Sequence, residues 1–219
     1  TPDMFGAVGD GVFDDTEAMI ACFNYANANL VPVVWHGKTI YMKTATEEHC
    51  PIIDVDCDFS GCTILMNSNN MGQTIFQIGP PPDYITDAMI GKTISAETCS
   101  TVFQDYPNSY ITVESYHYLG RRLNNPGTET WYRHKQGFVT NSYGAIQPLD
   151  LFREISEYKT VRRIDKIARP ITCTFGKLLI KNATASAVIL CHRANVTIQN
   201  TVIITSRSEE RFSRNAETD

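Results

Sequence analysis

The stretch that decides the fold is residues 3–16, Asp3-Met4-Phe5-Gly6-Ala7-Val8-Gly9-Asp10-Gly11-Val12-Phe13-Asp14-Asp15-Thr16. Gly9-Asp10-Gly11 favours a turn, because glycine and aspartate tolerate a positive φ. Asp14 and Glu17 have the D-x-x-E spacing of a capping box, which predicts a helix start. Apolar residues then follow at the spacing of an amphipathic helix, at Met19, Cys22, Phe23, Ala26 and Leu30. A short β-rich run, 31–35, comes next.

This order of turn, capped helix and strand resembles the start of the pectate-lyase-like superfamily of right-handed parallel β-helices. More narrowly, it is similar to bacteriophage tailspikes and capsule depolymerases, whose coil begins with D-x-F-G-A-x-G-D-G-x-x-D-D-T-x-A. The chain matches that segment at Asp3, Phe5, Gly6, Ala7, Gly9, Asp10, Gly11, Asp14, Asp15, Thr16 and Ala18. The resemblance implies an all-β fold, a right-handed parallel β-helix (a solenoid) with an N-terminal amphipathic capping helix. In that family the segment caps the coil and does not form the active site.

Short β-rich runs separated by turn residues continue this pattern along the chain, at 39–42, 52–55, 62–66 and 74–78. The runs 178–182 and 196–200 share the pattern apolar-x-Ile-polar-Asn, and their spacing is close to one coil of a solenoid. This repeat predicts that Ile180 stacks over Ile198 and Asn182 over Asn200. We therefore expect residues 1–45 to form the cap and 46–219 the strands of the coil, with a large irregular excursion at about 101–169. No C-terminal cap is recognisable, so we expect the chain to be part of a longer polypeptide.

Composition excludes several classes of protein. The 219 residues carry a net charge of −5, which argues against a general nucleic-acid-binding surface. No run approaches the roughly 18 apolar residues that predict a membrane span, and no signal peptide is visible. The seven cysteines contain no C-x-x-C pair, so we expect buried free thiols, no metal site and no cofactor. Free thiols fit folding in a reducing cytoplasm.

Aromatic and basic residues gather inside the irregular stretch. Aromatic faces stack on sugars and guanidinium groups pair with carboxylates, so a candidate site for an acidic polysaccharide consists of Arg121, Arg122, Trp131, Tyr132 and Arg133. The alternative is a solvated loop with a packed tryptophan. A second group, Arg162, Arg163 and Lys166, either faces an anionic glycan groove or belongs to a salt-bridged surface or a subunit contact.

Cleavage of a glycosidic bond requires a pair of carboxylates, or a base that removes a proton next to a uronate. On a β-helix such groups are distant in sequence, so the catalytic residues are unknown from the sequence. The weak candidates are Glu154, Asp165, Glu209 and Glu210, and the candidate bases for elimination are His117, His134, His192, Tyr116, Tyr118 and Tyr132. Asp54, Asp56 and Asp58 share one face of a strand and are expected to make turn hydrogen bonds or to bind a cation loosely.

The resemblance implies a tailspike-like protein of the phage virion that is folded in the host bacterial cytoplasm. It implies a homotrimer that joins other phage tail proteins and mediates host adhesion by binding and depolymerising a bacterial surface polysaccharide. The polysaccharide is a capsule, an O-antigen or an exopolysaccharide, and cleavage is by hydrolysis or β-elimination. The alternative is a non-enzymatic glycan-binding or structural module of a tail fibre or baseplate. A third possibility is a pectinase-like enzyme of a bacterium or fungus.

Overall fold

The computed structural model describes residues 1–67, 74–125, 128–147, 151, 153–181 and 189–205. It divides into two compact units, of which the first comprises residues 1–80 and 169–219 and the second residues 81–168. The second unit therefore interrupts the first in sequence. Each unit has its own hydrophobic core.

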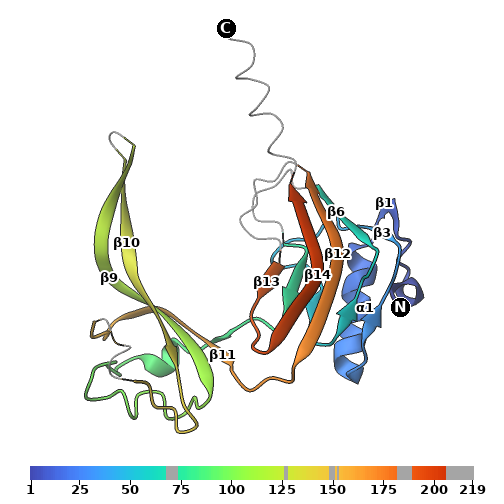
Figure 1. The fold of residues 1–219 in the computed structure, drawn as a ribbon. Helices are drawn as coiled ribbons and strands as arrows, with labels where there is room; N and C mark the ends of the chain where they lie inside the picture. The colour runs from blue at the N-terminus through green and yellow to red at the C-terminus, as the bar shows by residue number, and fades with distance from the viewer. Residues whose placement is uncertain (68–73, 126–127, 148–150, 152, 182–188, 206–219) are drawn as a thin grey trace. The chain divides into compact units, whose positions relative to one another are not determined.

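The first unit consists mainly of parallel strands in a curled sheet, with one α-helix beside it (Figure 1). The expectation of a strand-rich chain with parallel pairing is confirmed. The sheet has the order β1-β3-β6-β12-β5-β2 with β14 on β12, and a smaller parallel sheet has the order β13-β7-β4. The elements are η1 (Pro2–Phe5), β1 (Asp10–Asp14), α1 (Thr16–Asn29), β2 (Val33–Val34), β3 (Thr39–Tyr41), β4 (Ile52–Ile53), β5 (Cys57–Asp58), β6 (Thr63–Asn67), β7 (Phe76–Ile78), β12 (Ile171–Lys181), β13 (Ile189–Cys191) and β14 (Val196–Thr205).

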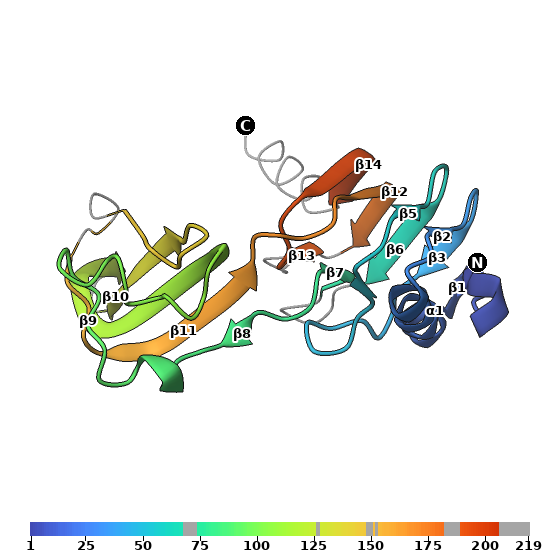
Figure 2. The ribbon, with the colours of Figure 1, turned by 90° about the horizontal axis from the view of Figure 1, so that it is seen from below.

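Paired strands of the first unit are separated by a nearly constant length of chain, which we call the pairing offset. Val33 of β2 pairs with Cys57 of β5, and Ile171 of β12 pairs with Val196 of β14. In both pairs the partner lies about two dozen residues further along the chain, a period typical of solenoids. Figure 2 shows the result, with β3, β6, β12 and β14 side by side. The first pair, Asp10 of β1 with Thr39 of β3, has a somewhat longer offset. Successive circuits of the chain therefore use similar lengths of backbone.

The second unit is an insertion into one such circuit. In the smaller sheet Ile52 pairs with Gln77 at the usual pairing offset, whereas Phe76 pairs with the distant Ile189. Residues 81–168, the whole second unit, lie between Phe76 and Ile189. When they are left out of the count, the separation of Phe76 and Ile189 equals that of Ile52 and Gln77. The first unit therefore keeps its pairing offset across the insertion.

The core of the first unit is a set of columns that run across the strands. Ile40 pairs with Ile64 and Ile64 with Leu178, and all three side chains are fully buried. A second column is aromatic: ring centroids lie 6.2 Å apart for Phe59 and Phe76 and 5.1 Å apart for Phe76 and Phe175. Because burial of one such side chain stabilises a fold by about 1.5–3 kcal/mol, these columns fix the register of the strands.

Helix α1 closes onto this core as predicted, except at its last apolar position. Met19, Cys22, Phe23 and Ala26 are buried, and the Phe23 ring lies edge-on to Phe59 with the centroids 6.2 Å apart. Leu30 is exposed, because it ends the helix in the left-handed conformation with a φ of 54°. The helical spacing fails there because the helix has already ended.

The predicted capping box does not form. Asp15 is the N-cap residue, and its buried carboxylate accepts hydrogen bonds from the backbone N–H groups of Val8 (2.8 Å) and Tyr41 (3.2 Å). The Asp14 carboxylate accepts from the Thr16 and Thr44 hydroxyls at 2.6 and 2.8 Å. The two aspartates therefore connect the opening turn, the helix and the next strand. In these positions they accept hydrogen bonds from more N–H and O–H groups than a capping box confined to the first helical turn would.

The predicted stacking of Ile180 over Ile198 is wrong. In the parallel pair β12–β14, Ile180 lies opposite Thr205, and Ile198 lies opposite Cys173 and is 47% exposed. The reason is that β12 and β14 pair at the pairing offset of about two dozen residues, whereas the two similar runs lie only 18 residues apart in the chain. Asn182 lies outside the described residues.

The second unit is a four-stranded antiparallel sheet in the order β10-β9-β11-β8. Its strands are β8 (Asp83–Tyr84), β9 (Ser109–Asn125), β10 (Thr128–Val139) and β11 (Tyr158–Asp165), and a short 3-10 helix, η2, spans Asp87–Met89. One face packs on a core that includes Phe103 and Phe138, whose ring centroids lie 6.0 Å apart. Within the described part of the chain, neither unit holds a helix long and apolar enough to cross a membrane.

Candidate functional site

The second unit presents one face of its sheet to solvent. Along β9 the odd positions Ile111, Val113 and Ser115 are buried, whereas the even positions face outward, at Tyr110, Thr112, Glu114, Tyr116 and Tyr118. This is the alternation that a strand with one packed face requires. We call the outward side, with its neighbours on β8, β10 and β11, the tyrosine–cation face.

Arg133 on β10 lies over two of these tyrosines. Its guanidinium carbon is 5.4 Å from the ring centre of Tyr116 and 5.1 Å from that of Tyr118. A bulge makes the double contact possible: Arg133 pairs with Tyr118 and Lys135 with Glu114, so more of β9 than of β10 lies between these two pairs. The tyrosine side chains stay about half exposed, at 52% and 47%. They therefore offer ring surface to a ligand.

Glu114 occupies the centre of this face and is surrounded by cations. Its carboxylate lies 2.9 Å from Lys159 Nζ, 3.1 Å from Lys135 Nζ and 3.9 Å from Arg133 Nε. The Glu114 side chain is only 17% exposed. The hydrogen bond from Lys159, more than any other contact, lowers the pKa of this carboxyl group below its ordinary value. Glu114 is therefore ionised at neutral pH.

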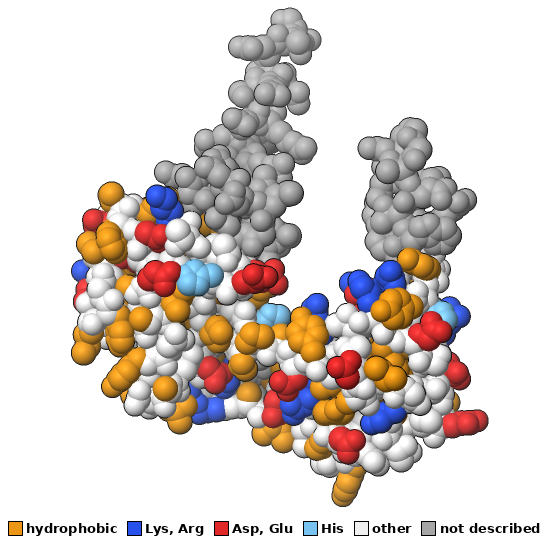
Figure 3. Space-filling view, turned by 180° about the vertical axis from the view of Figure 1, so that it is seen from behind, with side chains coloured by type: hydrophobic (Ala, Val, Ile, Leu, Met, Phe, Trp, Pro, Cys, Tyr) orange, Lys and Arg blue, Asp and Glu red, His pale blue; other side chains and the backbone are white. Residues whose placement is uncertain are grey.

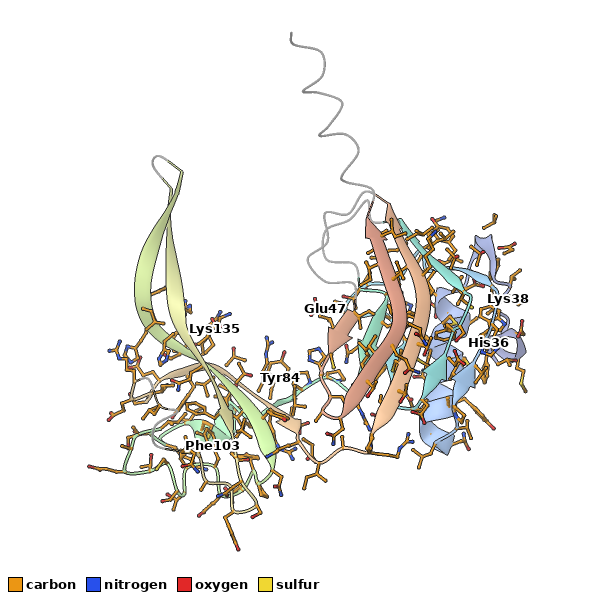
Figure 4. All side chains as sticks on the ribbon, in the orientation of Figure 1. His36, Lys38, Glu47, Tyr84, Phe103 and Lys135 are labelled. Carbon is orange, nitrogen blue, oxygen red and sulfur yellow. The ribbon has the colours of Figure 1, made fainter. Side chains whose placement is uncertain are left out.

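The same face continues onto β11 and β8. Arg162 pairs with Thr112 on one side and with Tyr84 on the other, and its guanidinium carbon is 5.4 Å from the Tyr84 ring centre. Figure 4 shows Lys135 on β10 and Tyr84 on β8, at opposite edges of the sheet. The structure thus places members of both basic groups, Arg133 of the first and Arg162 of the second, on one surface.

The other predicted binding residues lie on the same hairpin. Residues 121 and 122 belong to β9 and residues 131 and 132 to β10, with Trp131 paired to Arg121 and Tyr132 to Gly120. Their backbones are described, and their side chains lie outside the described atoms. Arg163 has a structural role, because its Nε donates to the Ser109 hydroxyl at 2.9 Å and its guanidinium pairs with Asp83.

The structure describes two of the four candidate carboxylates, Glu154 and Asp165. Asp165 accepts a hydrogen bond from the Ile167 N–H at 2.9 Å and pairs with Arg163 at 3.7 Å. Glu154 is exposed beside the bridge between Ile94 and Ile155. Glu209 and Glu210 lie outside the described residues. A catalytic role for any of them stays a prediction.

Among the other polar candidates, His134 and three aspartates are engaged in contacts within the fold. His134 is buried, with its Nε2 3.2 Å from the Gln136 amide oxygen. Asp54 pairs with Arg193, Asp56 accepts from the Thr172 N–H at 2.7 Å, and Asp58 accepts from the Ser60 N–H at 2.9 Å. The prediction that the three aspartates share one face of a strand is wrong, because Asp54 and Asp56 lie between β4 and β5 and only Asp58 belongs to a strand. An ion pair, a contact with β12 and a turn contact, respectively, account for them. Among the described residues no group of three or more His, Cys, Asp or Glu side chains is placed to hold a metal ion.

The cysteines are free thiols, as predicted, and six of the seven are buried. The exception is Cys191, which is exposed at the end of β13 although its apolar neighbours predict burial. Cys57 and Cys173 lie opposite each other on β5 and β12. Hydrogen bonding to Cys173, followed by burial, raises the pKa of the Cys57 thiol.

Glu114 and Tyr84 are among the members of the face that sequence reasoning missed. The signal for Glu114 was present, because Tyr110-Ile111-Thr112-Val113-Glu114-Ser115-Tyr116 alternates with the period of a half-buried strand. Tyr84 carries no such signal, since β8 has only two residues and follows three prolines. Its place on the face depends on its pairing with β11, about 80 residues later in the chain.

Comparison with known proteins gives a structural likeness but no likeness in sequence. No family model matches the chain, and no curated protein matches its sequence. Among solved structures, the tailspike protein gp49 from Pseudomonas phage LKA1 is similar, with 13% sequence identity and a TM-score of 0.36. The likeness covers 82% of this chain and 36% of the length of that tailspike. A likeness at this TM-score does not establish a shared function.

Proposed function

We propose that the chain is part of a tailspike-like protein that binds a bacterial surface polysaccharide and depolymerises it. The observation that carries the proposal is the nearly constant pairing offset of the first unit, behind a helix whose opening segment resembles that of tailspikes. Similar circuits of parallel strands with columns of buried side chains are what a right-handed parallel β-helix requires. We assign the first unit to that fold.

The tyrosine–cation face is the proposed site of polysaccharide binding. Tyrosine rings such as Tyr116 and Tyr118 supply flat surfaces for the C–H faces of sugars, and Arg133 holds them in place from one side. Figure 3 shows hydrophobic side chains next to charged ones on one side of the second unit. The face suits glycan binding because the antiparallel sheet of the second unit holds these side chains in a fixed geometry.

A second candidate function is glycan binding without cleavage. The observation that favours it is that Glu114 and Asp165 are held in ion pairs, so neither is placed as a proton donor in the described part of the chain. We further propose, with the resemblance as the basis, that the protein is a homotrimer of the phage tail that assembles with other tail proteins.

A panel of purified capsular polysaccharides, O-antigens and exopolysaccharides separates these functions. Falling polymer length with new absorbance near 232 nm indicates a lyase, new reducing ends without that absorbance indicate a hydrolase, and binding without either indicates an adhesion module. The test variant is Tyr116→Ala with Tyr118→Ala. The matched control is Tyr143→Ala, because Tyr143 is 81% exposed in the second unit but lies in a turn after β10. Equal glycan binding by both variants would remove the face from consideration.

A further inference from the structure

The charges on the tyrosine–cation face do not cancel. One carboxylate, that of Glu114, faces Lys159, Lys135 and Arg133 within 4 Å. Arg162 of β11, which pairs with Thr112 of β9, adds a fourth positive charge to the face. This excess contrasts with the net charge of −5 for the whole chain. The face is therefore a local positive site on an acidic protein.

The cations keep hydrogen-bonding capacity for a ligand. An ammonium group has three donors, and each lysine directs one of them to a different oxygen of Glu114. The Lys135 and Lys159 side chains are 66% and 44% exposed, so their remaining donors reach solvent. Glu114 holds both ammonium groups at a separation that a single carboxylate can span. The carboxylate of a ligand can approach from the solvent side and accept hydrogen bonds from the remaining donors of both lysines.

The aromatic rings restrict the kind of anion that fits. Tyr116 and Tyr118 are about half exposed beside Arg133, and Tyr84 is 66% exposed beside Arg162. Rings of this kind pack against the C–H face of a pyranose, while the neighbouring cation pairs with an acidic substituent on the same sugar. A surface with cations alone would accept any polyanion. The alternation of ring and cation along the face matches a chain of sugars that bear carboxylates.

We infer that the tyrosine–cation face binds a carboxylate-bearing polysaccharide, such as a polymer of uronic or sialic acids, with Lys135, Lys159 and Arg133 as the carboxylate-binding groups. This inference rests on the proposed function and adds the substrate class to it. Neutral glycans bring no carboxylate to the remaining donors of these cations and bind more weakly. Nucleic acid is the competing polyanion, and phosphates that pair with the lysines leave the tyrosine rings to stack on bases instead.

The experiment compares acidic glycans with their carboxyl-reduced forms. Oligogalacturonate and colominic acid are reduced chemically so that each carboxylate becomes a primary alcohol and the sugar backbone is retained. Binding to the full chain is measured by isothermal calorimetry at several salt concentrations, with dextran sulfate and oligo(dT) as polyanion controls. Since a hydrogen bond to a charged group contributes about 1.5–3 kcal/mol, reduction is expected to weaken binding at least about tenfold.

Variants assign the effect to the face. Lys159→Gln and Arg133→Gln are expected to lose the preference for the acidic form. Lys92→Gln is the matched control and is expected to keep it, because Lys92 belongs to the same unit and its ammonium group pairs with Asp105 at 3.6 Å. Thermal unfolding of each variant verifies that the second unit is folded.

Each outcome has a separate meaning. Equal binding of the reduced and acidic forms overturns the substrate class and leaves the proposed polysaccharide binding intact. Equally tight binding of oligo(dT) or dextran sulfate, with the same salt dependence, shows a general polyanion surface and also overturns the inference. Binding of the acidic form that the variants do not change removes the face as the site. If no glycan binds, including those of the bacterial panel, the proposed function itself fails.

Discussion

Replacement of Gly176 by alanine tests the strand pairing on which the fold assignment depends. Gly176 lies in the middle of β12 with a φ of 67°. A Cβ atom there would lie 2.6 Å from the carbonyl oxygen of Cys62 and 2.8 Å from that of Phe59. Both oxygens belong to the backbone of the neighbouring turn, and the Cys62 oxygen already accepts a hydrogen bond from the Lys177 N–H at 3.0 Å. The turn cannot retreat without losing that bond.

The magnitude follows from two contributions. A side chain in the left-handed conformation costs about 1–2 kcal/mol, and forced overpacking costs about 1–3 kcal/mol more. We therefore expect Gly176→Ala to lower the free energy of unfolding by about 2–5 kcal/mol. The matched control is Gly37→Ala, because Gly37 has a φ of 65° and no atom within 4 Å of a built Cβ. The control should lose only the conformational part, about 1–2 kcal/mol.

The assays are urea unfolding, which gives the free energy of unfolding, and thermal unfolding, which gives the midpoint temperature. Both are monitored by tryptophan fluorescence. Trp35 is buried in the first unit, and a Trp131→Phe background leaves it as the single tryptophan reporter of the two in the chain. At about 2–4 °C per kcal/mol for a chain of this size, thermal midpoints should fall by about 10 °C for Gly176→Ala and by about 4 °C for Gly37→Ala. Losses that agree within about 0.5 kcal/mol would refute the close approach of β12 to the preceding turn, and with it the parallel pairing.

Three further predictions concern single side chains. Lys159 lowers the folded-state pKa of Glu114 below its ordinary value of 4.5, so this contact stabilises the fold above pH 4.5 and the stabilisation is lost as the pH falls through the lowered, folded-state pKa. Glu114→Gln should therefore flatten the acid limb of a pH–stability curve. Glu157→Gln, at an exposed acid in the same unit, should leave the curve unchanged. Asp14→Asn should cost about 1–2 kcal/mol of unfolding free energy through weaker hydrogen bonds to the Thr16 and Thr44 hydroxyls, and a loss no larger than that of Asp3→Asn would contradict this role. A thiol reagent should modify one cysteine rapidly in the folded chain and none in Cys191→Ser, so that rapid labelling of several thiols would show an open core.

The local elements of the first unit could be predicted from the sequence because their signals are local. The helical spacing from Met19 to Ala26 and the short β-rich runs each involve residues close together in the chain, and the structure has a helix and strands there. The prediction of a capping box was wrong because the contacts of these aspartates are not local. Asp14 and Asp15 have partners as far away as Thr44 and Tyr41, and a motif confined to one turn does not reveal them.

The candidate site was predictable only in composition. The abundance of arginine and aromatic residues near Arg133 was visible, but its neighbours Tyr116, Tyr118 and Glu114 depend on the bulge between β9 and β10. A one-residue shift in that register would turn each side chain to the other side of the sheet. Sequence spacing does not fix such a shift, because it results from the packing of the opposite face on the core.

The residues of the chain alone predict a turn, a helix, short strands and a basic, aromatic segment in an acidic chain. The pairing of the strands of the first unit at a nearly constant offset, and the insertion of residues 81–168 between two of them, are visible only in the folded structure. The same holds for the meeting of Glu114, Lys159 and Arg133 on one face. The physical reason is that parallel pairing and cross-strand contacts join residues far apart in the chain, and their register is set by side chains that pack together only when the chain is folded.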